Sequence, residues 1–313
     1  MYYVSLPVHE KLNVVIDQLE NFCTYSDFTV VVHVSKEGEF CTQELQDCIV
    51  SHKLDERVLV NPISVSTGWG RIIDAHLQNI SFLEELGANL DDKVIFHSSN
   101  DMFVKLGVVD YVSNKSSLFH LRNCVSNQYW WPAEVAQKDK NLLEAVAGCG
   151  GVRLVGSQIE GSMYPLDVLI EIKEIIRRYQ LTKSELFYPR EEFYFSSFAL
   201  ALGLKPEATP YVYSEVHRFD AKIWNYWRFC DRFLPLNVGR LAKRAGNFLY
   251  FRSGFYKISK SDISNIRNHT ISLPHIYEGN SIWRPYISAE SLFAVKRVSR
   301  SYDDPIRAFI RSL

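Results

Sequence analysis

Hydrophobic and polar residues follow two different patterns over the first hundred residues. Runs rich in β-branched residues, typical of buried strands, are interleaved with segments whose apolar residues recur every three or four positions, as on one helix face. Strands are predicted at 2–8, 28–34, 58–60 and 93–97, and helices at 12–22, 42–51 and 72–83. This alternation predicts an α/β fold with a mostly parallel sheet flanked by helices.

The pattern changes in the second half of the chain. Residues 105–150 show no clear period and lead into a glycine-rich turn. Pro165 then begins a helix that ends in Arg177 and Arg178, which matches the preference for proline at helix starts and basic residues at helix ends. Pro189 begins the next helix, and its apolar residues again follow helical spacing.

Composition limits the class of protein. The 313 residues suit one large domain or one domain with an appended lobe, and 47% hydrophobic residues provide a core without disulfide support. The six cysteines form no CxxC pair, which predicts reduced thiols and a cytoplasmic protein. A net charge of −1 argues against nucleic-acid binding. The N-terminus lacks the basic and apolar regions of a signal peptide.

Two carboxylates, Glu191 and Glu192, follow Pro189 in the predicted first turn of a helix. Acidic residues are stabilised at the positive end of a helix, and this effect alone accounts for them in many proteins. The alternative is that one of them takes a proton from a reacting group. In that interpretation Glu192 is the base, while Glu191 faces solvent or caps the helix.

Six short segments occur along the chain in a fixed order. They are Val8-His9-Glu10-Lys11 with the strand end His33-Val34, Trp69-Gly70-Arg71, the run 99–105, Gly161-Ser162-Met163-Tyr164, Pro189-Arg190-Glu191-Glu192-Phe193, and Leu292-Phe293-Ala294-Val295-Lys296. Together they resemble blocks of the core-2/I-branching N-acetylglucosaminyltransferase and peptide xylosyltransferase family and its bacterial polysaccharide relatives. The resemblance implies a GT-A-like fold and inverting transfer of a sugar from a nucleotide-sugar donor.

The resemblance also implies roles for individual residues. Glu192 would be the catalytic base, and the proposed acceptor-binding residues are Glu160, Ser162 and Tyr164. The proposed donor-binding residues are Val8, His33, Trp69, Arg71, Asp101, Lys296, Arg297 and Arg300. No Asp-x-Asp motif follows the strand at 28–34, where the chain reads Val34-Ser35-Lys36. The resemblance therefore implies a metal-independent enzyme without a cofactor, in which basic side chains offset the charge of the leaving diphosphate.

The same comparison predicts a single domain in three parts. Residues 1–110 would form the nucleotide-sugar-binding half, 111–236 the acceptor and catalytic half, and 237–313 a basic C-terminal lobe. The acceptor would be a glycan or lipid-linked glycan in surface polysaccharide synthesis. The eukaryotic members are membrane-anchored and disulfide-bonded, whereas this chain shows neither feature, which favours a bacterial-type cytoplasmic enzyme.

Three questions remain open at this point. Residues 237–260 contain six basic residues, no acidic residue and interleaved aromatics, so they are either a peripheral contact with the inner membrane face or an ordinary solvated surface. The donor is either a nucleotide sugar or a phosphorylated pentose. The third question is whether the protein is an enzyme or a catalytically silent carbohydrate-binding protein.

Overall fold

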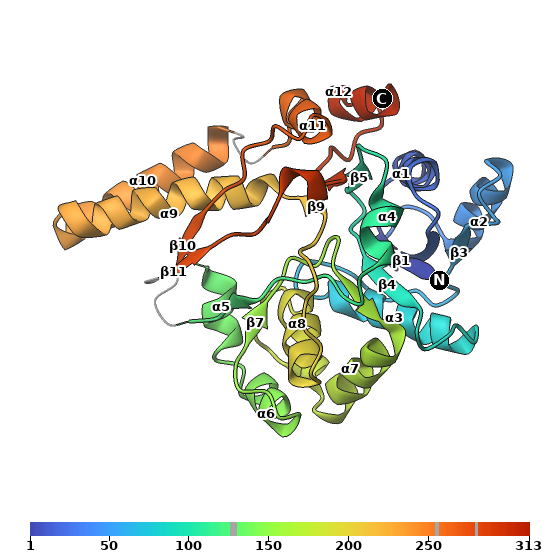
Figure 1. The fold of residues 1–313 in the computed structure, drawn as a ribbon, viewed down its shortest axis with the longest axis horizontal. Helices are drawn as coiled ribbons and strands as arrows, with labels where there is room; N and C mark the ends of the chain where they lie inside the picture. Colours follow the sequence, from blue (N-terminus) through green and yellow to red (C-terminus); the bar gives the residue numbers. More distant parts are fainter. Residues whose placement is uncertain (126–129, 254–256, 279–280) are drawn as a thin grey trace.

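The computed structural model describes residues 1–125, 130–253, 257–278 and 281–313, with the backbone alone at Phe251 and Ser281. Its central sheet has five strands in the order β3-β2-β1-β4-β8 (Figure 1). These strands are β1 (Tyr2–Val8), β2 (Thr29–Val34), β3 (Val58–Val60), β4 (Lys93–Phe96) and β8 (Met163–Pro165). β1, β2, β3 and β4 are parallel, and β8 is antiparallel to β4. The predicted α/β fold with a mostly parallel sheet is confirmed.

The strand residues alternate between two hydrophobic cores. In β2, Val30, Val32 and Val34 belong to one core, while Val31 belongs to the other. This period of two follows from the pleat of a strand, which sends successive side chains to opposite faces. Since both faces are covered, β2 is apolar from Val30 to Val34 with the exception of the buried His33.

Helices cover both faces of the sheet. On one face lie α1 (Leu12–Tyr25), α2 (Thr42–Ser51) and α4 (Val108–Ser113). On the other lie α3 (Ile72–Glu85), α5 (Trp131–Ala136), α6 (Lys140–Gly148), α7 (Leu166–Arg178) and α8 (Glu191–Ala201). The helices predicted in the first half and those after Pro165 and Pro189 are therefore present. α8 is buried on nearly all sides, because Phe193, Tyr194, Phe195 and Phe198 all belong to the same core.

A smaller sheet joins distant parts of the chain. It has the order β5-β12-β9, formed by β5 (Met102–Phe103), β12 (Ala294–Val295) and β9 (Val212–Tyr213). Each of the three predicted parts supplies one strand, so the C-terminal segment is built into the fold of the earlier ones. The predicted division itself is not tested. Helices α11 (Lys260–Arg267) and α12 (Pro305–Arg311) pack near this sheet around a third core.

Two long helices project from the rest of the molecule as a hairpin (Figure 1). They are α9 (Glu215–Phe233) and α10 (Leu236–Ser253), which the sequence analysis did not predict. Small residues let the helices approach closely, because a Cβ at Gly246 would lie 2.3 Å from the Tyr226 ring. Two two-stranded sheets complete the fold, β6 (Arg122–Asn123) with β7 (Val155–Gly156), and β10 (Ile276–Glu278) with β11 (Ser281–Trp283).

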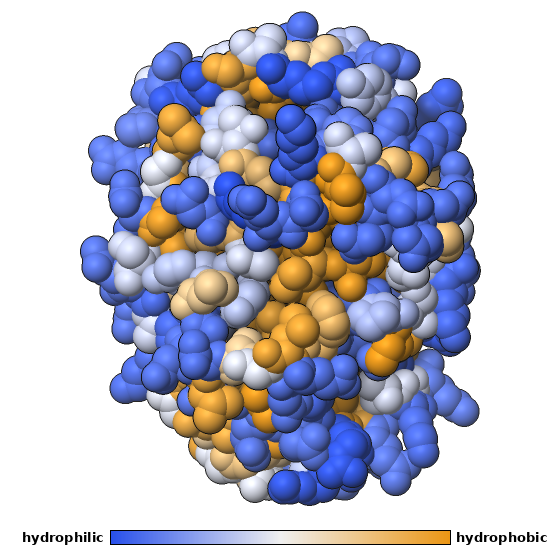
Figure 2. All heavy atoms as spheres, turned by 90° about the vertical axis from the view of Figure 1, so that its right-hand side faces the viewer, coloured by the Kyte–Doolittle hydropathy of each residue, from blue (hydrophilic) through white to orange (hydrophobic). Residues whose placement is uncertain are grey.

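The surface on the opposite side from the hairpin is mainly hydrophilic, with hydrophobic residues showing between the polar ones (Figure 2). Among the described residues, no helix is long and apolar enough to cross a membrane. All six cysteines are unpaired.

Candidate functional site

A pocket forms where the first turns of α8 and α9 meet the segment after β12. Its lining combines charged and aromatic side chains from seven separate stretches of sequence. The lining residues are Arg122, Trp130, Ser157, Gln158, Glu192, Ser214, Val216, His217, Asp220, Trp283, Lys296 and Arg297. The pocket encloses about 80 Å³, room for a phosphate-sized group, whereas whole-ligand sites usually measure about 300–1,000 Å³.

Glu192 enters this pocket from the first turn of α8. Its backbone carbonyl accepts a hydrogen bond of 2.8 Å from the Ser157 amide, which ties the helix start to the turn after β7. Glu191 is also buried, with 7% of its surface exposed, and its Oε2 has no hydrogen-bond partner. The prediction that Glu191 faces solvent is therefore wrong, while its alternative role as a helix cap stays a prediction. Its side chain turns inward because nearly every side of α8 is covered by the core.

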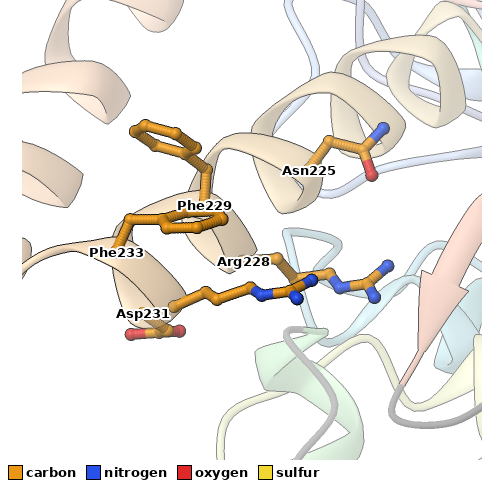
Figure 3. A pocket seen from close by; sticks show the side chains of 6 residues that line it. Asn225, Arg228, Phe229, Asp231 and Phe233 are labelled. Carbon is orange, nitrogen blue, oxygen red and sulfur yellow. The ribbon is translucent and has the colours of Figure 1, made fainter.

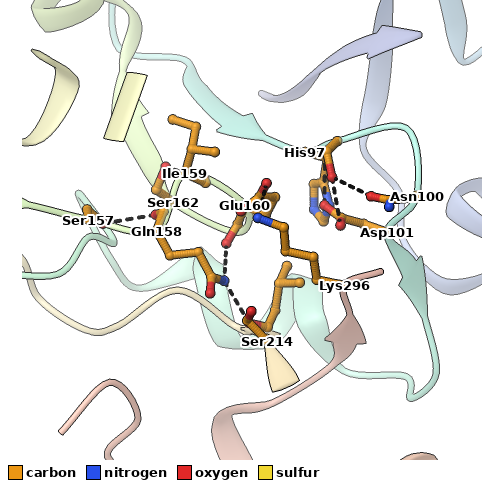
Figure 4. A network of polar contacts seen from close by, with 12 residues as sticks. His97, Asn100, Asp101, Ser157, Gln158, Ile159, Glu160, Ser162, Ser214 and Lys296 are labelled. Carbon is orange, nitrogen blue, oxygen red and sulfur yellow. Dashed lines mark hydrogen bonds and ion pairs between the residues drawn. The ribbon is translucent and has the colours of Figure 1, made fainter. Parts of the chain in front are cut away.

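Lys296 follows β12 and points toward Glu160 (Figure 4). The Lys296 Nζ lies 2.6 Å from the Glu160 Oε1, while the Glu160 Oε2 is buried without a partner. Glu160 is held at the end of β4, because the neighbouring Gly161 amide donates to the Phe96 carbonyl at 2.8 Å. Ligands of parallel sheets bind beyond the carboxyl ends of strands, and this carboxylate lies at such an end.

Arg122 is enclosed by aromatic rings on one side of the pocket. Its guanidinium carbon lies 3.9 Å from the ring centre of Trp130, 4.5 Å from that of Trp283 and 5.0 Å from that of Trp224. It also forms a buried ion pair with Glu278. The pairing offsets the cost of burying this charge, and the rings fix the guanidinium in place.

Burial changes the protonation of the carboxylates in and beside this pocket. It raises the pKa of Glu192 to about 7, and the nearby Lys296 opposes the shift. Burial, followed by repulsion from Glu192, raises the pKa of Glu191 to about 8. Burial also raises the pKa of Asp220 to about 7, against the attraction of Arg122. The pocket therefore holds carboxyl groups that exchange protons near neutral pH, a property common at catalytic sites.

Two buried histidines beside the pocket stay neutral. Burial lowers the pKa of His120 to about 3, and it lowers the pKa of His217 well below its usual value. The Nδ1 of His217 lies 3.0 Å from the Tyr286 hydroxyl. His217 can therefore donate or accept a hydrogen bond in the pocket without adding a charge.

The structure brings together several residues that the sequence analysis selected. Glu192, Lys296 and Arg297 all line the pocket, and Glu160 pairs with Lys296. Arg297 adopts a positive φ of 66°, an uncommon conformation for a residue with a side chain.

Other predicted donor-binding residues lie elsewhere. Arg300 is outside the pocket lining, with its Nε 3.0 Å from the Glu10 Oε1. Asp101 is fully buried and accepts hydrogen bonds of 2.9 Å from both the amide and the hydroxyl of Ser98. It therefore orders its own loop. Val8 and His33 are fully buried, and the His33 Nε2 accepts a hydrogen bond of 2.9 Å from the Val65 amide.

Two of the three predicted acceptor-binding residues are packed inside the protein. The Ser162 hydroxyl donates to the Ile159 carbonyl at 2.6 Å, and Tyr164 stacks on Phe119 with ring centres 5.3 Å apart. Both side chains are at most 1% exposed, so neither can contact an acceptor directly. The prediction that they bind the acceptor is wrong, and their role is structural. Both residues lie at or just before β8, the strand next to β4, and the two faces of β8 belong to the two hydrophobic cores.

Trp69 and Arg71 lie on a different surface. Trp69 is 51% exposed and its ring centre lies 4.6 Å from that of Phe187, so it packs on the segment that leads into α8. Arg71 lines a separate, more open hollow together with Asp74 and Arg190. Neither side chain lines the pocket that contains Glu192.

The sequence analysis missed several lining residues, among them Arg122, His217, Asp220 and Trp283. Arg122 falls in the stretch without clear period, and the other three belong to elements that were not predicted. The useful signal was the spacing Ser214, His217, Asp220, which places one residue on each turn of a single helix face.

The fold and the pocket define an α/β protein with a carboxylate-rich and cation-rich site at the end of its parallel sheet. Among the described residues, no three His, Cys, Asp or Glu side chains are grouped so that they could hold a metal ion.

No protein-family model matches the chain, and no curated protein sequence matches it. Among solved structures, the chain is similar to the crystal structure of 4-diphosphocytidyl-2C-methyl-D-erythritol synthase. The identity is 13% and the TM-score 0.34, with 66% of this chain and 86% of that chain covered. A similarity at this level supports no statement about activity, so the function is argued from the site.

Proposed function

We propose that this protein is an inverting, metal-independent glycosyltransferase that moves a sugar from a nucleotide-sugar donor to a glycan acceptor in surface polysaccharide synthesis. One observation carries the proposal. Glu192 precedes Lys296 and Arg297 by about a hundred residues in sequence, yet all three line the same pocket. The sequence resemblance implies Glu192 as the base and Lys296 as a phosphate ligand, and Arg297 is the neighbour of Lys296 that would share this role.

Glu192 has the properties that the chemistry requires of a base. An acceptor hydroxyl must lose a proton as its oxygen attacks the anomeric carbon of the donor. A base works best when its pKa is near the operating pH, and burial raises the pKa of Glu192 to about 7. The proton passes to Glu192, and the bond between the sugar and the diphosphate breaks on the opposite side of the anomeric carbon.

Lys296 and Arg297 would offset the negative charge that grows on the departing diphosphate. Before a donor binds, Glu160 partly neutralises Lys296. A diphosphate would compete for this cation and leave Glu160 able to accept a hydrogen bond from the acceptor. Glu160 is the one predicted acceptor-binding residue whose position supports that role.

The volume of the pocket favours a second candidate donor. A space of about 80 Å³ accommodates a phosphate group, so most of a nucleotide sugar would have to extend outside it. A phosphorylated pentose is smaller, and the same basic residues would serve its phosphates. This second donor class changes the leaving group but keeps the role of Glu192.

Both donor classes can be tested on the purified full chain. A thermal-shift screen of nucleotide sugars and phosphorylated pentoses should find one class that raises the melting temperature, because a ligand of the folded state stabilises it. The active donor should then release its nucleotide or phosphate equally with and without EDTA. If none of these donors is bound or turned over, the glycosyltransferase proposal is wrong. If EDTA stops turnover and Mn²⁺ restores it, the metal-independent mechanism is wrong.

A further inference from the structure

The α9–α10 hairpin carries an exposed surface with two kinds of side chain. Its hydrophobic members are large and unusually accessible, including Leu236 at 79% and Leu241 at 70% exposure. The others are Phe229, Phe233, Val238, Phe248 and Leu249, each more than half exposed. Exposed basic residues accompany them, namely Lys222, Arg228, Arg232, Arg240, Arg244 and Arg252. These residues together are called the hairpin surface.

The apolar residues of α10 form a stripe. Val238, Leu241, Ala245 and Phe248 follow one another at intervals of three and four, so they share one helix face. The face that packs on α9 is different, since it contains Gly239, Gly246 and Asn247, the last bonded to Trp227 at 2.8 Å. The stripe is therefore not used for packing within the described chain, and it faces solvent.

On α9, two phenylalanines lie at the end of the helix. The rings of Phe229 and Phe233 have centres 5.1 Å apart and stand beside Arg228 and Arg232 around a surface hollow (Figure 3). The Arg232 guanidinium lies 5.3 Å from the Phe233 ring centre, and that of Arg252 lies 5.4 Å from the Phe248 ring centre. Aromatic rings and guanidinium groups thus occur together on both helices.

The hairpin is strongly basic in a nearly neutral protein. Residues 215–253 contain eight Lys or Arg residues and three acidic residues, Glu215, Asp220 and Asp231, while the whole chain has a net charge of −1. Asp231 is itself paired with Lys243. Apolar residues flanked by cations are characteristic of helices that lie in the interface of an anionic membrane. A second copy of the chain is a poorer occupant, because a symmetric contact would oppose two basic surfaces.

We propose that the hairpin surface binds the headgroup region of an anionic lipid membrane, with its Phe and Leu side chains inserted among the lipids. The proposed membrane contact therefore involves both α9 and α10. The sequence predicted a possible membrane contact only at residues 237–260. Of these, residues 254–256 lie outside the described part of the chain. The inference goes beyond the proposed function and does not depend on it. At 1.5 Å per residue, Phe233 lies about 20 Å along α9 from Asp220 in the pocket. Docking would hold the pocket close to the membrane surface.

The test is flotation of the full chain with lipid vesicles. Vesicles of phosphatidylcholine alone should bind weakly, and vesicles that also contain phosphatidylglycerol should bind at least about tenfold more protein at low salt. High salt should reduce that binding, because screening weakens attraction between exposed charges. Equal binding to both vesicle types, or binding to neither, would overturn the proposal.

Variants distinguish the hairpin surface from other parts of the protein. Phe229→Ser with Leu241→Ser should weaken binding about tenfold or more, and Arg240→Glu with Arg244→Glu should abolish the preference for anionic vesicles. Matched controls are Leu86→Ser with Leu90→Ser, and Lys11→Glu with Lys140→Glu, all at exposed positions outside the hairpin. Melting curves verify that each variant is folded. If the Phe229→Ser, Leu241→Ser variant does not fold, the Arg240→Glu, Arg244→Glu variant still tests the proposal. Controls that lose binding equally would refute it. So would concentration-dependent self-association that the hairpin variants abolish without any vesicle binding.

Discussion

Two clusters of buried polar side chains lie near the carboxyl end of β4, and they differ in how completely their atoms are paired (Figure 4). In the first, both ring nitrogens of His97 and both carboxyl oxygens of Asp101 have hydrogen-bond partners. In the second, around Lys296, the Oε2 atoms of Glu160 and Glu191 are buried without any. Complete pairing stabilises a fold, whereas an unpaired buried carboxylate costs free energy unless something binds to it.

This difference separates two kinds of buried charge that look alike in sequence. Asp101 and Glu192 both stand in motifs that resemble a glycosyltransferase family, and both were selected as site residues. The structure gives Asp101 a complete set of local partners and gives Glu192 a raised pKa in an accessible pocket. We therefore expect substitutions in the Asp101 cluster to lower stability without changing activity, whereas substitutions of Glu192 and Lys296 lower activity even where stability is restored. Four experiments test this comparison.

The largest effect is expected for Glu192→Gln. The amide keeps the size of the side chain but cannot take a proton, so turnover should fall by about 10²–10⁴-fold. Donor binding, measured by thermal shift, should remain. Glu144→Gln, at an exposed position of α6, is the matched control and should be fully active. Normal turnover in Glu192→Gln would show that Glu192 is not the catalytic base.

Removing the cation should have the next largest effect. Lys296→Met should lower kcat by about 10²-fold, because the leaving diphosphate loses one stabilising charge. The substitution also removes the ion-pair partner of the buried Glu160 carboxylate, so the free energy of unfolding should fall by about 3–5 kcal/mol. The double variant Lys296→Met with Glu160→Gln should regain much of that stability in urea titrations and remain inactive. Recovery of activity in the double variant would contradict a direct role for Lys296.

Asp101→Ala should affect stability instead of chemistry. It removes a carboxylate that accepts from Ser98 and His97, which leaves buried donors unpaired at a cost of about 2–4 kcal/mol. The melting temperature should fall, while kcat per folded molecule and the donor KM stay near their original values. A rise in the donor KM without a loss of stability would instead show that Asp101 binds the donor.

The smallest effect is a change in how stability depends on pH. The pKa of Glu191 is about 8 in the folded protein, above the usual value for a glutamate, so folding binds a proton between about pH 4.5 and 8. The stability that Glu191 contributes is therefore present at low pH and is lost as the pH rises through 8.

Glu191→Gln measures that contribution. The melting temperature of the original protein minus that of the variant should decrease from pH 5 to pH 8. Buried histidines such as His120, whose pKa burial lowers to about 3, affect both proteins alike and cancel in the difference. A difference that stays constant with pH would mean that Glu191 is not held protonated.

The sequence by itself determined the four parallel strands of the central sheet and the helices between them, but not β8. Apolar periods of two and of three or four depend only on local backbone geometry, so β1 to β4 and α1 to α3 were readable directly. Motif order along the chain also selected Glu192 and Lys296. Hairpin helices α9 and α10 were not predicted. In α10, exposed apolar residues and small packing residues blur the usual amphipathic pattern of a helix. α9 has a clear amphipathic pattern, so its sequence did carry a helix signal.

Only the tertiary structure decided which charges share a pocket and which have their own partners. Arg122 meets Trp283 across more than 150 residues, and Lys296 reaches Glu160 only because β12 pairs with β9. Contacts of this kind depend on strand pairing between distant segments, for which local sequence has no signal. Burial, which moves the pKa of Glu192 to about 7, is likewise a property of everything packed around the side chain.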